Sequence, residues 1–102
     1  MGKLSARLVG GLLGLALASG LALSAQAECY VDYKAKRDNP LRLAYGVAQV
    51  SDAACGNRKA ERAELAPRLE AAGWTLLKII SNFGPAGLEK RKAIAGEFFL
   101  RY

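Results

Sequence analysis

The sequence contains no histidine, and its 102 residues include only two cysteines and one methionine. The absence of histidine removes the side chain that most often acts as a general base near neutral pH. It excludes Ser-His-Asp and Cys-His catalytic sets and most zinc sites. After residue 27 there are only two serines, Ser51 and Ser81, and neither lies in a G-x-S-x-G or S-x-x-K motif. We therefore predict no catalytic set, no metal site and no cofactor.

A second absence concerns charge, because no charged residue occurs in the 20 positions that follow Arg7. Two positive charges precede this apolar stretch, and the small-x-small pattern of a signal peptidase site ends it at Ala25 and Ala27. The pattern predicts a cleaved secretory signal peptide over residues 1–27, followed by a mature domain over residues 28–102. The stretch is also long enough to span a bilayer, so its retention as a membrane anchor is the alternative.

The mature part carries most of the charge and all of the aromatic residues. Only two of the 15 basic residues and none of the nine acidic residues lie before position 28, so residues 28–102 have a net charge of +4. Their larger apolar residues suffice for one small core. No internal repeat, low-complexity segment or linker divides this part, which predicts a single domain.

Cys29 and Cys55 are the only cysteines. In an exported chain, an even number of cysteines without C-x-x-C spacing predicts a structural disulfide. In the chain-entropy model, closing a loop of this size contributes roughly 3.5 kcal/mol of stability. Two buried free thiols are the alternative.

In the first half of the mature part, apolar residues first alternate with polar ones, as in strands, and then recur with the spacing of a helix. We predict strands over residues 29–36 and 41–50, joined as a hairpin by the turn Arg37-Asp38-Asn39-Pro40. A helix is predicted over residues 57–72, with Asn57 as its N-cap, Gly73 at its C-terminal end and a kink or break before Pro67.

The second half begins with the most apolar run of the chain, residues 74–83, which we interpret as the central strand. A short helix over residues 88–95, ended by Gly96, and a last strand over residues 97–102 follow. The predicted fold is α+β in the order ββαβαβ. Its four-stranded mixed sheet would contain parallel crossovers, with two helices packed on the sheet and one disulfide.

The junction Ala72-Gly73-Trp74-Thr75-Leu76-Leu77, together with the Cys29 and Cys55 frame, resembles small exported proteins of alphaproteobacteria that have no assigned activity. The resemblance covers nearly all of the mature part. It implies a location in the periplasm and no particular reaction.

Basic residues gather around the hairpin, early in the first helix and late in the second. The candidates for contact with an anion or a partner are Lys34, Lys36, Arg37, Arg42, Lys90, Arg91 and Lys92. A solvated surface balanced by acids is the alternative interpretation. Nucleic acid is not an expected partner, because the protein is predicted to be exported and no basic stripe with interleaved aromatics is present.

The favoured prediction is a small periplasmic binding or accessory module without catalytic activity, whose partner is a protein or an anionic envelope component. The alternative is a membrane-anchored subunit of an inner-membrane complex, on the periplasmic side, with residues 1–27 retained. A third hypothesis is a carboxylate-dependent hydrolase of envelope material that uses some of the acids Asp32, Asp38, Asp52 and Glu97.

Overall fold

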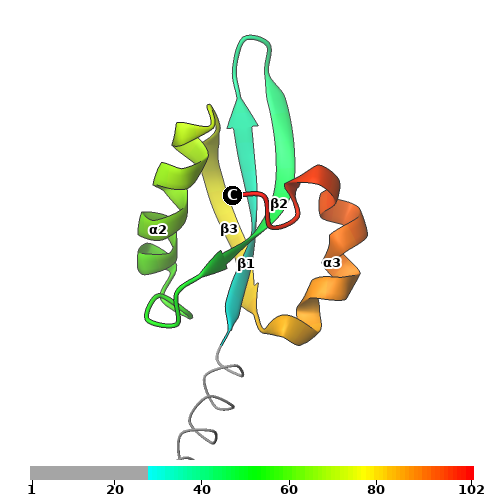
Figure 1. The fold of residues 1–102 in the computed structure, drawn as a ribbon. Helices are drawn as coiled ribbons and strands as arrows, with labels where there is room; N and C mark the ends of the chain where they lie inside the picture. Colours follow the sequence, from blue (N-terminus) through cyan, green and yellow to red (C-terminus); the bar gives the residue numbers. More distant parts are fainter. Residues whose placement is uncertain (1–27) are drawn as a thin grey trace, which may run out of the picture.

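The computed structural model describes residues 28–102. Its main elements are β1 (Cys29–Arg37), β2 (Arg42–Val50), α2 (Arg58–Ala71), β3 (Thr75–Phe83) and α3 (Leu88–Ala95) (Figure 1). The short 3-10 turns η2 (Pro85–Gly87) and η3 (Gly96–Phe98) flank α3. A small compact α+β domain is therefore confirmed. The predicted signal peptide over residues 1–27, with its cleavage motif at Ala25 and Ala27, lies outside the described residues.

Strand β1 is the centre of the described sheet, whose order is β2-β1-β3. It pairs antiparallel with both neighbours. Because β2 and β3 both run against β1, they run in the same direction as each other, and α2 connects them. The expected mixed sheet was wrong: β1 lies between the two strands that the crossover joins, so both pairs of neighbouring strands in the described sheet are antiparallel.

The two helices pack on opposite faces of the sheet. Successive side chains of a strand point to opposite faces. Val31 and Tyr33 of β1 belong to the main core cluster together with Leu65 of α2, whereas Tyr30 belongs to a smaller cluster with Ala95 of α3. We refer to these two sides as the α2 face and the α3 face. The sheet is thus the middle layer of three.

Helix α2 begins and ends at the predicted residues. The Asn57 side chain accepts a hydrogen bond from the backbone N–H of Ala60, at 3.0 Å. At the other end Gly73 has a φ of 87°, and the N–H groups of Gly73 and Trp74 donate to the carbonyls of Glu70 and Leu69. This is a Schellman motif, which requires a left-handed residue at that position. The helix runs through Pro67 as one element, so of the predicted kink or break the break is wrong.

The small side chains of β2 allow a close approach on the α2 face. A Cβ atom at Gly46 would overlap the hydroxyl of Tyr33, which lies across this position from the neighbouring strand. Ala44 and Ala48, on either side, are buried in the main core. The glycine therefore leaves room for a tyrosine in the centre of the sheet.

Strand β3 was expected at the centre of the sheet and instead lies at its edge. Its pairing with β1 is irregular at two points, between Asp32 and Tyr33 and between Lys34 and Ala35. Irregular register breaks the strict alternation of side chains between the two faces. The apolar residues of β3 are consequently distributed over both faces, with Leu77 and Ile80 exposed. The continuous apolar run reflects this irregularity and not burial on both sides.

The predicted fourth strand, residues 97–102, is not a strand. It consists of the end of η3 and irregular chain, with one bridge pair between Phe99 and Val47. Phe98 and Tyr102 pack against the main core, whereas Phe99 packs against the smaller cluster of the α3 face. The alternating apolar pattern arises because this segment wraps around the edge of β2 and places side chains on both faces.

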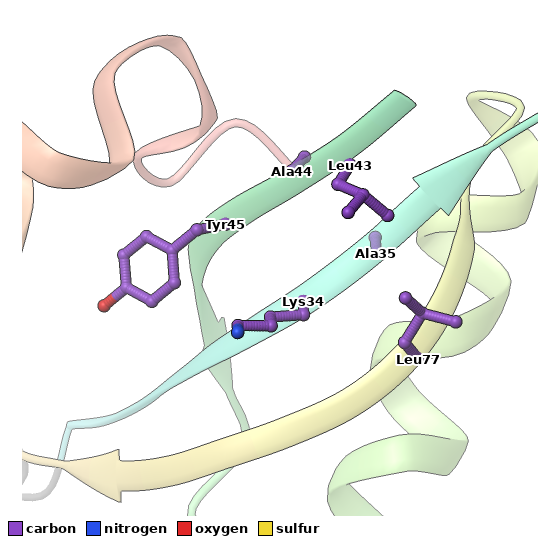
Figure 2. Close-up of a pocket in the computed structure, with 6 residues that line it drawn as sticks. All are labelled: Lys34, Ala35, Leu43, Ala44, Tyr45 and Leu77. Carbon is purple, nitrogen blue, oxygen red and sulfur yellow. The ribbon is translucent and has the colours of Figure 1, made fainter. Parts of the chain in front are cut away.

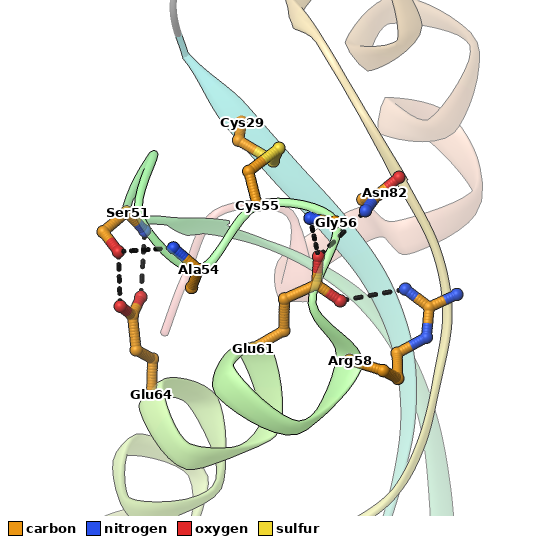
Figure 3. Close-up of a disulfide and its surroundings, with 9 residues drawn as sticks. All are labelled: Cys29, Ser51, Ala54, Cys55, Gly56, Arg58, Glu61, Glu64 and Asn82. Atoms are coloured by element: carbon orange, nitrogen blue, oxygen red, sulfur yellow. Dashed lines mark hydrogen bonds and ion pairs between the residues drawn. A yellow bond between two sulfur atoms is a disulfide. The ribbon is translucent and has the colours of Figure 1, made fainter.

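The predicted disulfide between Cys29 and Cys55 is confirmed, with the two Cα atoms 5.9 Å apart. It joins the first residue of β1 to the loop between β2 and α2 (Figure 3). Glu61, fully buried at the first turns of α2, supports the same loop. Its carboxylate accepts hydrogen bonds from the Gly56 N–H, the Arg58 guanidinium and the Asn82 amide, each at 2.9 Å.

Candidate functional site

Asp32 fixes α3 to the sheet. Its carboxylate accepts a hydrogen bond from one residue of each neighbouring element: the Tyr45 hydroxyl at 2.8 Å, the Ser81 hydroxyl at 2.7 Å and Arg91 Nε at 3.1 Å. Arg91 also lies over the ring of Phe83, with its guanidinium carbon 3.9 Å from the ring centroid. Asp32 is 5% exposed, so these contacts are largely shielded from water.

The protonation of this cluster follows from its contacts. Burial raises the pKa of Asp32, but the hydrogen bonds from Ser81, Tyr45 and Arg91 outweigh it, so the net shift is below the usual range. Burial and the hydrogen bond to Asp32 raise the pKa of Tyr45 to about 12. Asp32 is therefore ionised and Tyr45 neutral at neutral pH, and the carboxylate already accepts three hydrogen bonds within the protein.

The four acids considered for hydrolysis are not assembled into a site. Asp32 is occupied as described, Asp38 forms an ion pair with Lys36 at 3.2 Å, and Glu97 lies 3.6 Å from Arg101. Asp52 is exposed in the loop after β2. Within residues 28–102 no three metal-type ligands come together. A short hydrogen bond between Ser51 and Glu64 ties the loop to α2 and lowers the pKa of Glu64 (Figure 3).

Helix α3 covers only part of its face, and the remainder forms a shallow hollow of about 210 Å³. The hollow is mainly apolar and is lined by residues of all three strands: Lys34, Ala35, Leu43, Ala44, Tyr45 and Leu77 (Figure 2). Leu43 is 72% exposed and Leu77 is 45% exposed. We call this region, together with the hairpin turn that continues it, the open half of the α3 face.

The hairpin turn extends the same surface. The turn between β1 and β2 projects beyond both helices at the top of Figure 1. Leu41, at its end, is 64% exposed. Lys34 and Lys36 alternate with buried residues of β1 and lie on the α3 face beside these leucines. Exposed leucines and lysines therefore share one surface.

The basic residues predicted as one hairpin group separate onto two faces. Arg37 and Arg42 lie opposite each other at the end of the hairpin, on the α2 face. Of the helical candidates, Lys90 and Lys92 are exposed, whereas Arg91 is held by Asp32. Sequence reasoning treated Asp32 and Arg91 as surface charges. The one sequence feature that indicated their pairing was Asp32 itself, a lone acid between Val31 and Tyr33 in a strand whose neighbouring residues are buried.

A second hollow, of about 100 Å³, lies on the α2 face at the end of the hairpin. Three arginines, one acid and aromatic side chains surround it, including Arg37, Arg42, Arg101, Glu97, Trp74 and Tyr102. We call it the arginine pocket. No sequence pattern predicts this pocket, because the alternation of residues 97–102 favours a separate strand for Arg101 and Tyr102.

None of the helices in residues 28–102 combines the length and the apolar character needed to cross a bilayer. No protein-family model matches the chain, and no curated protein or solved structure matches it either.

Proposed function

We propose that this chain is a small exported binding module without catalytic activity, which attaches to an anionic phospholipid surface through the open half of the α3 face. The observation that carries the proposal is the combination of protruding leucines with lysines on one uncovered surface. The disulfide supports export, because such bonds persist in oxidising compartments.

The geometry suits an interface better than a deep binding cavity. Leu41 and Leu43 are more than half exposed at the projecting end of the molecule, where they can enter the boundary between headgroups and acyl chains. Each basic residue near an anionic membrane contributes about 1 kcal/mol, and each leucine that leaves water contributes up to about 2 kcal/mol. A few such groups produce weak attachment that salt reverses.

Vesicle sedimentation tests the proposal. It uses the protein in the form, cleaved or uncleaved, in which its native host accumulates it. We expect binding to vesicles that contain phosphatidylglycerol, weaker binding at high salt and none to neutral phosphatidylcholine. The double variant Leu41→Ser/Leu43→Ser loses most of the binding. Ile94→Ser is the matched control, because Ile94 is 71% exposed but lies on α3. A wild-type protein that ignores the anionic vesicles, or equal losses in both variants, contradicts the proposal.

The intact mass of the native protein tests export separately. We expect a chain that begins at Glu28 and gains 2 Da on reduction, since each disulfide takes up two hydrogens. A chain that retains residues 1–27 is instead the membrane-anchored subunit considered above. That result would reject the cleaved module.

A further inference from the structure

The arginine pocket brings three positive charges together at one end of the α2 face. Arg37 and Arg42 are direct cross-strand partners at the end of the β1–β2 ladder. Like charges in this arrangement destabilise a hairpin. Arg101 brings a third guanidinium to the same hollow. Glu97, the only acid in the lining, pairs with Arg101 at 3.6 Å and is largely exposed, which leaves a net charge of +2 around the pocket.

Arg37 is held in place before any ligand arrives. Its guanidinium carbon lies 4.3 Å from the centroid of the Trp74 ring, and its Nη2 donates to the carbonyl of Ala72 at 3.2 Å. That carbonyl is fixed in turn by the end of α2. A guanidinium fixed by stacking loses little further freedom on binding an anion.

Arg42 retains its full bonding capacity. It forms no ion pair with any residue of the described range, 28–102, and it is exposed at the rim of the pocket. Each guanidinium presents a planar fork of N–H donors that matches two oxygens of a phosphate or carboxylate. Two or three such forks around one hollow favour a tetrahedral anion with several oxygens over a single carboxylate.

We propose that the arginine pocket binds a phosphate group, which Arg42 and Arg101 grip from the rim and Arg37 from the Trp74 side. The hollow of about 100 Å³ holds roughly three water molecules, enough for one such group and no larger ligand body. The rest of the ligand would extend into solvent. This site is separate from the open half of the α3 face, because it lies on the opposite side of the sheet.

The single tryptophan of the chain provides the readout. The Trp74 side chain is 3% exposed, and its indole N–H has no hydrogen-bond partner within residues 28–102. Its one indole N–H resonance and its fluorescence therefore report on the ring that supports Arg37. Inorganic phosphate is titrated without membranes, with sodium chloride keeping the ionic strength constant. We expect a saturable change with a dissociation constant of about millimolar order.

Variants at the rim test the assignment. Arg42→Gln/Arg101→Gln is expected to weaken phosphate binding by at least about tenfold. The control Lys90→Gln/Lys92→Gln removes the same charge from α3, at exposed positions, and leaves binding unchanged. Arg42→Lys keeps the charge but loses the fork, so binding weakens here also. Equal weakening in the two double variants, or the same Trp74 change with chloride alone, overturns the proposal.

The source of the phosphate group is decided by a second pair of titrations. Free glycerol phosphate is compared with phosphatidylglycerol vesicles, using the Leu41→Ser/Leu43→Ser variant so that the hairpin contributes little. A Trp74 response to the free ester alone assigns a soluble phosphate ester as the ligand. A response to vesicles as well assigns the lipid headgroup.

Discussion

The α2 face and the α3 face are built on the same three strands but are covered by different interactions. Under α2 the central contacts are apolar, with Leu65 and Leu69 fully buried against the sheet, and the polar contacts of Glu61 lie at the first turn of the helix. Under α3 the central contact is a buried ion pair between Asp32 and Arg91. The α2 face therefore provides most of the hydrophobic stability. The α3 face fixes the position of α3 and leaves part of the sheet uncovered.

The sharpest test of this comparison truncates one leucine on each face. Leu65→Ala is expected to lower the free energy of unfolding by about 3–4 kcal/mol, because it empties a fully buried site. Leu88→Ala on α3 removes a partly buried side chain and is expected to cost about 1 kcal/mol. Urea denaturation with the disulfide intact measures both. Equal losses would show that the two faces contribute alike.

A second test removes the charge of Asp32. Asp32→Asn leaves Arg91 partly buried without its counterion, so we expect a loss of about 2–3 kcal/mol at pH 7. Asp52→Asn, in an exposed loop, is the matched control and is expected to have little effect.

The pH dependence extends this test. The pKa of Asp32 is lowered in the folded state, so its contribution is fully present above its unfolded pKa of about 4 and is lost as the pH falls through the folded value. Glu61 also has a lowered pKa and contributes in the same direction. Stability measured from pH 7 to pH 3 should therefore decline less steeply in Asp32→Asn than in the wild type. Parallel curves would contradict the role of Asp32.

The smallest effect compares one tyrosine on each face. Burial raises the pKa of Tyr33 to about 12, and its hydroxyl has no hydrogen-bond partner within residues 28–102. Tyr33→Phe is therefore expected to raise stability by up to about 1 kcal/mol. Tyr45→Phe loses the bond to Asp32 and is expected to lower stability by about 1 kcal/mol. Thermal unfolding distinguishes the two, and shifts of the same sign would refute this contrast.

Local signals in the sequence predicted the helices and the disulfide well. Asn57, Gly73 and Gly96 mark ends that short-range backbone geometry determines, and the cysteine pair had no other partners. Strand order was not predictable in the same way, because it depends on which faces the helices cover. The central strand β1 is covered on both faces, with Tyr30 and Asp32 buried on the side of α3.

The sequence indicated which residue types occur at the candidate site but not how they are arranged in space. The sequence groups the lysines and arginines of the hairpin by their proximity along the chain, but their separation onto two faces depends on strand register. The arginine pocket depends on the wrapping of residues 97–102 around β2, which brings Arg101 next to Arg42. An alternating apolar pattern does not distinguish such a segment from a strand.

That wrapping has a consequence for self-association. Leu100 donates its N–H to the carbonyl of Val47 at 2.8 Å, with a φ of 55°, so the segment occupies backbone groups on the outer side of β2. On the other outer strand, Arg58 donates to the carbonyl of Ile80, and the register irregularities disturb the ladder. Free sheet edges are templates for pairing with further chains. With backbone groups on both outer strands already bonded, one copy offers less to a second, which disfavours edge-to-edge polymerisation of the sheet.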